Sequence, residues 1–403
     1  MDKQRTKVRN YFSPVPVVLF LGALCTASVG LACEGERQIR TFQEIEGELQ
    51  EIDLGGDMPG NILFRCPSSV GDSTLLQLRN FLSSLAGTID QQRRLRRAGQ
   101  TGYPTHGAAS GDSIGDYGRL STFASADYNN VDRSRTTLGQ GLTQDSFSFT
   151  WGADYRLRDT LFLGGTLNLL SSDTDIDDNL GSTDVNTIVM GFHGSQYWQN
   201  DLFLDWLATL SYSDLDIDRT DLAGSYKAST DAWHWSTELS FGHQLSVSRW
   251  RITPIARLFY MRGQLDGYTE RVVSQFGDPE VADKQSHNLT MFDLSLQTDY
   301  VLLANWGVVI PSFKLAYERD FSGTSSSSGR VLTTQETLHI FYSGETDDPD
   351  RNTVMARLGV SAQFQRGLSA FINYQHLLGH DYFDRYHIGA GIRYEIPLGF
   401  AGF

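Results

Sequence analysis

Closely spaced carboxylates are the first side chains in this sequence that could bind a ligand. Asp173, Asp175 and Asp177 stand at alternate positions, and carboxylates spaced in this way can wrap around a calcium ion. The most familiar loop of this kind has Gly at its sixth position and Glu at its twelfth. Here those positions hold Asp178 and Asp184. We interpret the run as a solvated acidic loop and keep a weak calcium site as the alternative.

Histidines near the C-terminus are the second candidates for chemistry. His376, His380 and His387 stand close to Asp381 and Asp384, and such groups can transfer protons. A hydrolase in the wall of a barrel would need His clustered with Ser, Asn or Asp, and no His here is followed closely by Ser-Asn-Gly. We interpret these residues as histidines with solvent partners. The sequence predicts no catalytic residue and no cofactor, with a barrel hydrolase as one alternative.

The elements that must position these residues are β-strands, and the last one shows the pattern most cleanly. One face carries Tyr386, Ile388, Ala390, Ile392, Tyr394 and Ile396. The other face carries Arg385, His387, Gly389, Gly391, Arg393 and Glu395. A two-residue period with one apolar face and one polar face is typical of a strand between lipid and a polar lumen.

Twelve such strands are predicted after the first quarter of the chain. Each is long enough to cross a bilayer, which takes about 9–11 residues in a tilted strand. The predicted ranges are 117–128, 144–157, 160–172, 184–198, 201–214, 230–246, 249–263, 286–303, 306–320, 352–365, 368–378 and 385–396. The fold class is therefore all-β, a twelve-stranded antiparallel transmembrane β-barrel. A large water-soluble β-protein is the alternative.

The connections between these strands alternate in length. Those near Arg158, Asn200, Ser248, Asn305 and Gly367 are short, and the others are mostly long, acidic and rich in Ser, Gly and Asp. Outer-membrane barrels have short periplasmic turns and long outer loops. With an even number of strands, the first strand begins and the last strand ends on the same side of the membrane, here the periplasmic side.

The N-terminus reads as a secretory signal peptide over residues 1–32. Basic residues precede an apolar run that ends at Gly30-Leu31-Ala32, a small-x-small cleavage site. The formal net charge is −15, and removal of the signal takes it to about −18. An acidic chain gives no support for nucleic-acid binding. Cys33 and Cys66 would then be the cysteines of the mature chain, joined in a disulfide in an oxidising compartment; lipidation of Cys33 is the alternative.

Residues 33–72 form a short polar segment without a strong period, which we expect to be irregular. A helix is predicted next, over 73–98, because Leu75, Leu78, Leu82, Leu85 and Ile89 recur every three or four residues. Its basic end suits the negative pole of a helix and contains Arg93, Arg94, Arg96 and Arg97. A flexible linker rich in Gly, Ser and Ala follows over 99–116, and the barrel takes 117–403.

The last strands also carry motifs of a known family. The motifs are Asp350-Arg351-Asn352, Ala356-Arg357-Leu358-Gly359-Val360-Ser361, Gly367-Leu368-Ser369-Ala370-Phe371 and His387-Ile388-Gly389-Ala390-Gly391-Ile392-Arg393-Tyr394. Through them, residues 117–403 resemble the β-barrel translocator domain of bacterial autotransporters. The resemblance implies a twelve-stranded barrel with the preceding helix threaded through the lumen. The helix arginines would then face lumen carboxylates such as Glu238, Asp293 and Asp299.

The resemblance implies the function as well. We expect an outer-membrane barrel of a Gram-negative bacterium that translocates or anchors a short N-terminal segment, since about 40 residues are too few for a sizeable passenger. Expected partners are outer-membrane lipid, periplasmic chaperones and the barrel-assembly machinery, which would read Tyr394, Phe400 and Phe403 in a monomeric chain. The alternative is a stand-alone porin-like or adhesin barrel that binds ligands through its outer loops.

Overall fold

The computed structural model describes residues 38–45, 48–51, 85, 87–91, 119–135, 141–220, 224–274, 279–322, 326–332, 338–345 and 351–396. All of them belong to Gly35–Phe403, one of the two compact units of the chain. No helix within these ranges is long and apolar enough to cross a bilayer.

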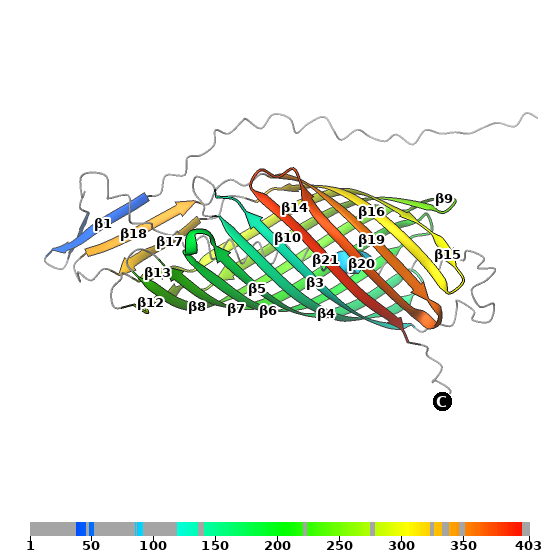
Figure 1. Cartoon of the computed structure of the whole chain (residues 1–403), viewed down its shortest axis with the longest axis horizontal. Helices are drawn as coiled ribbons and strands as arrows, with labels where there is room; N and C mark the ends of the chain where they lie inside the picture. Colours follow the sequence, from blue (N-terminus) through cyan, green and yellow to red (C-terminus); the bar gives the residue numbers. More distant parts are fainter. Residues whose placement is uncertain are drawn as a thin grey trace, which may run out of the picture. The chain divides into compact units, whose positions relative to one another are not determined.

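Twelve long antiparallel strands form a closed ring in the described part of the chain (Figure 1). The last strand pairs with the first, from Phe383 opposite Arg133 to Glu395 opposite Ser121, so the ring has no free edge. The fold class predicted from the sequence is confirmed. The strands are β3 (Leu120–Arg133), β4 (Leu142–Arg158), β5 (Leu161–Ile176), β6 (Gly181–Tyr197), β7 (Leu202–Thr220), β8 (Ser225–His243), β10 (Trp250–Leu265), β14 (Gln285–Tyr300), β16 (Gly307–Asp320), β19 (Asn352–Phe364), β20 (Leu368–Leu378) and β21 (Phe383–Glu395).

Burial in this ring is the reverse of that in a water-soluble protein. On β8, Trp233 and Trp235 are about half exposed, at 52% and 46%, whereas His234, Ser236 and Glu238 between and after them are buried. The outward face is apolar because lipid covers it, and the inward face is polar because it lines a lumen. This arrangement puts chemistry-bearing side chains inside the barrel.

Short turns join the strands at one end of the barrel. The turns after β4, β6 and β19 are tight. Within two of these turns, Asp201 and Arg366 adopt positive φ values of 61° and 62°. Two small strands, β9 (Leu245–Val247) and β15 (Leu302–Ala304), extend the sheet at this end through pairing with β10 and β16. The prediction of long connections at the other end holds in part. Those between β10 and β14 and between β16 and β19 are long, whereas β5–β6, β7–β8 and β20–β21 are joined by only four residues each, because these strands extend beyond their predicted bounds.

Two of the connections that were predicted as loops contain strands, namely the one between β10 and β14 and the one between β16 and β19. A second antiparallel sheet has the order β11-β13-β17-β18-β1-β2, and residues 33–72 contribute two strands to it rather than being wholly irregular. Short strands paired with distant partners leave no clear local period. The small strands are β1 (Gln38–Ile45), β2 (Glu48–Glu51), β11 (Tyr268–Thr269), β13 (Glu280–Ala282), β17 (Ser326–Leu332) and β18 (Leu338–Glu345), with β12 (Arg271–Val272) paired to β8.

A short helix precedes the barrel. The structure describes it at Leu85 and at Gly87–Gln91, which lie within the predicted range of 73–98. We call these residues the lumen helix, for the contacts given below.

Candidate functional site

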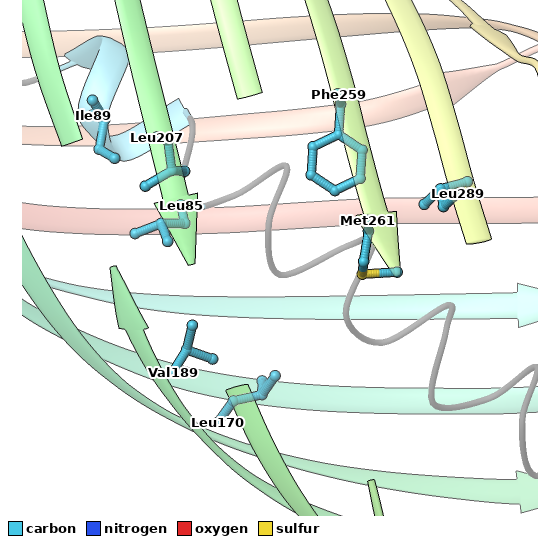
Figure 2. Packing of buried hydrophobic residues seen from close by; sticks show 8 residues of the cluster. All are labelled: Leu85, Ile89, Leu170, Val189, Leu207, Phe259, Met261 and Leu289. Carbon is cyan, nitrogen blue, oxygen red and sulfur yellow. The ribbon is translucent and has the colours of Figure 1, made fainter. Parts of the chain in front are cut away.

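The lumen helix packs on a patch of apolar side chains on the inner wall (Figure 2). Leu85 and Ile89 are four residues apart and therefore lie on one face of the helix. That face meets inward residues of β5, β6, β7, β10 and β14, which are Leu170, Val189, Leu207, Phe259, Met261 and Leu289. The two helix residues and these six wall residues form one buried apolar cluster, so the patch is a seat for the helix.

The other side of the lumen helix contacts a polar part of the wall. Gln91 donates a hydrogen bond from Nε2 to Oγ of Ser361 on β19. At Gly87 the helix passes so close to Arg357 that an added Cβ would lie 2.6 Å from Nη1. Gln375 on β20 holds that guanidinium through a hydrogen bond of 2.8 Å from Nε. Contacts with opposite parts of the ring place the lumen helix inside the barrel.

Charged side chains of the wall pair with one another, both between neighbouring strands and across an intervening strand. Glu238 lies 3.2 Å from Nε of Arg257. Asp154 lies 2.6 Å from both His193 and Arg393. All five side chains are buried. Such pairs compensate for the loss of water around each charge, so the lumen can be highly charged and still be an ordered wall.

The structure places the three predicted lumen carboxylates on the inner face. Besides Glu238, these are Asp293 on β14 and Asp299, which accepts a hydrogen bond of 2.9 Å from Gln297. Tyr394 faces outward on β21 and is 42% exposed. The remaining predicted site residues lie outside the described ranges; they are Arg93, Arg94, Arg96, Arg97, Cys33, Cys66, Phe400 and Phe403.

The calcium candidates do not lie together on a loop, contrary to the prediction. Asp173 and Asp175 are on β5 and point outward, and Asp177 begins a short 3-10 turn. Asp173 lies opposite Asp145 on one neighbouring strand and Asp184 on the other. The described residues contain no group of three or more His, Cys, Asp or Glu side chains placed to hold a metal.

The three C-terminal histidines occupy different environments. His387 points into the lumen and lies 2.9 Å from Asp127. His376 lies 3.7 Å from Asp384 near the surface, and Nδ1 of His380 accepts hydrogen bonds from the backbone of Tyr382 and Phe383. Each ring therefore has a structural role of its own, and the structure does not bring the three together as one site.

A buried ion-pair cluster at the long-connection end was missed by the sequence analysis. Arg219 on β7 binds both oxygens of Glu270, at 2.8 Å and 2.7 Å. Its guanidinium also lies 3.9 Å from Glu280 and 3.9 Å from the ring centre of Tyr226. We call these four residues the Arg219 clamp. The signal was present in the inward alternation of Leu215, Ile217 and Arg219, which runs on past the predicted end of the strand.

The Arg219 clamp holds the connection between β10 and β14 against the inner wall. Tyr268 and Ala282 of that connection pack with apolar side chains that point inward from β6, β7, β8 and β10. The apolar partners are Val185, Leu215, Ile217, Ala232 and Leu265. This part of the lumen is therefore covered at the long-connection end.

Comparison with known proteins identifies the family to which this chain belongs. A family model described as the autotransporter beta-domain matches residues 122–375, which is more than half of the chain. The uncharacterized protein YaiT of Escherichia coli (strain K12) is 21% identical over 226 residues, 55% of this chain and 21% of that protein. YaiT of Salmonella typhimurium is 22% identical over the same length. The chain thus spans about a fifth of the length of these curated relatives.

Two solved structures share the fold. The translocator domain of the autotransporter NalP from Neisseria meningitidis gives a TM-score of 0.55 at 14% identity, covering 78% of this chain and 98% of that one. The beta domain of the Bordetella autotransporter BrkA gives a TM-score of 0.52 at 17% identity, covering 68% and 99%. At these identities the likeness establishes the architecture alone.

Proposed function

Because the chain belongs to the autotransporter beta-domain family, a family of outer-membrane barrels, we propose that it carries a short N-terminal segment through its lumen and holds it at the cell surface. The short turns would face the periplasm and the long connections the outside. We further propose that the barrel works as a monomer in outer-membrane lipid, after delivery by periplasmic chaperones to the barrel-assembly machinery.

One observation carries this proposal: β1 and β3 are attached to opposite ends of the barrel. β1 pairs with β18, from Gln38 opposite Ser343 to Gln43 opposite Leu338. β18 belongs to the long connection between β16 and β19. β3 begins at the short-turn end, where Leu120 lies opposite Tyr155. The lumen helix stands between these two strands in the sequence, which supports a path through the barrel.

The pairing also supports retention of the segment. β1 adds to β18 as a strand, and this mode of binding uses main-chain hydrogen bonds that need no particular side chains. β2 then pairs with β1 and forms an edge of the second sheet. A small segment without a hydrophobic core of its own can be ordered in this way by the outer connections.

Protease shaving of intact cells tests the proposal. An epitope tag inserted at 46–47, between β1 and β2, should be removed from whole cells if the segment is outside. A tag at 275–278, in a long connection, should also be removed, whereas a tag at 159–160, in a short turn, should be protected. Protection of the 46–47 tag until the outer membrane is breached would place the segment in the periplasm and overturn the proposal.

Retention is tested separately with a strand-breaking variant. β18 pairs with β17 on one side and β1 on the other, so Ile340→Pro removes a ladder hydrogen bond from a central strand. If a protease site is added within 52–84, the cut segment should stay with wild-type cells and be released from the variant. Release from both would show that β18 does not hold the segment.

A further inference from the structure

Two inward histidines flank a glycine near the long-connection end of the lumen. His234 on β8 and His287 on β14 both lie opposite Gly263 of β10, the strand between them. Neighbouring strands are about 4.8 Å apart, so the two histidine backbones are separated by about 10 Å. Two imidazoles joined to one ion by bonds of about 2.0 Å can bridge such a span.

The glycine leaves the space that the first ring occupies. A Cβ added at Gly263 would lie 2.1 Å from Cδ2 and 2.6 Å from Nε2 of His234. The ring of His234 therefore lies over the backbone of β10, the strand that separates it from His287.

Both rings are buried without hydrogen-bond partners. Their exposed fractions are 2% and 3%, and none of their four ring nitrogens makes a hydrogen bond. The other buried lumen histidines contrast with them, because His193 is bound to Asp154 and His387 to Asp127. A buried polar group without a hydrogen-bond partner lowers the stability of the fold. In this pair, all four ring nitrogens are buried in that way.

We propose that His234 and His287 bind a copper ion in the lumen. Neutral imidazole nitrogens are good ligands for copper, and among the common divalent metals copper binds such sites most tightly. Met261, the next inward residue along β10, lies opposite Ser236 and Leu289, each two residues from one of the histidines, and is fully buried. Its thioether is a soft ligand that also favours copper. Water can complete the coordination of a site with two protein nitrogens.

The experiment uses the full-length chain purified in detergent, stripped with a chelator and titrated with Cu²⁺ alone. The expected result is one tightly bound ion whose electron paramagnetic resonance spectrum shows coupling to histidine nitrogen. His234→Gln and His287→Gln should each weaken binding at least tenfold. His376→Gln, which changes a partly exposed histidine outside the site, should leave both binding and spectrum unchanged.

Gly263→Ala keeps both histidines and provides a second test in case the glutamine variants fail to assemble into a barrel. Its methyl group displaces the ring of His234, so it should weaken Cu²⁺ binding while the barrel still shows heat-modifiable migration. Absence of tight binding to the wild-type chain would overturn the proposal. So would a spectrum and affinity that persist in the two glutamine variants and in Gly263→Ala, because the bound ion would then lie elsewhere.

Discussion

At the scale of single residues, the Arg219 clamp brings three charged side chains together in a buried place at the long-connection end. Arg219, Glu270 and Glu280 are each at most 6% exposed. Glu270 also accepts a hydrogen bond of 2.9 Å from the backbone of Glu280. The planar guanidinium group of arginine can bind both oxygens of a carboxylate at once, which the compact ammonium group of lysine is not shaped to do. The clamp therefore fixes the connection between β10 and β14 more firmly than its many polar residues suggest.

Replacement of Arg219 by Met should release that connection. Two carboxylates would be left buried without their cation, which costs about 3–5 kcal/mol when a buried pair is broken on one side. Backbone amides of 268–272 and 279–282 should lose hydrogen-exchange protection while those of the β5–β6 ladder keep theirs. Lys284→Met is the matched control, because its pair with Asp266 is more than half exposed and should change stability by less than about 1 kcal/mol. Unchanged protection in Arg219→Met would contradict this role.

At the scale of elements, the lumen helix and its seat are two amphipathic surfaces that fit each other. The helix presents Leu85 and Ile89 to the apolar patch, and Gly87 and Gln91 to the side with Arg357 and Ser361. Rotation of the helix about its axis would bury apolar groups against charges. This fit distinguishes a helix that fills the lumen from one that merely connects two parts of the chain.

Charge placed on the apolar side of the helix should open the lumen. Leu85→Asp combined with Ile89→Asp puts two carboxylates against the seat, so the helix should leave it and single-channel conductance should rise several-fold from a low starting value. Val247→Asp, at the short-turn end and 64% exposed, should leave conductance as in the wild type. A large conductance in the wild type that the double variant does not change would favour a stand-alone pore with its helix outside the lumen.

The elements that the sequence predicted well are those with a strong local period. All twelve barrel strands overlap their predicted ranges, because lipid on one side and the lumen on the other force apolar and polar residues to alternate. β1 and β18 were missed because each is ordered by a partner about 300 residues away. The Arg219 clamp was missed for the same reason, since Arg219 and Glu270 are 51 residues apart. The alternation of His234 with Trp233 and Trp235 in the sequence favours an inward position for it, but its place opposite Gly263 follows only from the register of the strands.

At the scale of the whole molecule, the barrel is completed by one seam, between β21 and β3. Tyr394 lies on the outward face of this seam, opposite Thr122 on β3 and Leu368 on β20. An exposed aromatic residue near the end of the last strand suits both the membrane interface and recognition by the assembly machinery.

Tyr394→Ala should reduce assembly in cells more than it reduces the stability of the finished barrel. The amount of heat-modifiable barrel in the outer membrane should fall several-fold, whereas refolding of the purified chain into detergent should be nearly normal. Tyr374→Ala is the matched control, because Tyr374 faces outward on β20 with almost the same exposure, 43% against 42%. Equal loss in the two variants would mean that Tyr394 contributes only as an interfacial aromatic.

The seam has a kinetic consequence. Its two strands are separated by more than 250 residues of sequence, so their union carries the largest loop-closure entropy of any neighbouring pair in the ring. Contacts of this kind form late and slow the folding of β-proteins. Until β21 arrives, β3 has a bare edge and the chain is open to pairing with other chains. The time between synthesis of the first strand and the last is therefore the interval in which this protein is most exposed to aggregation.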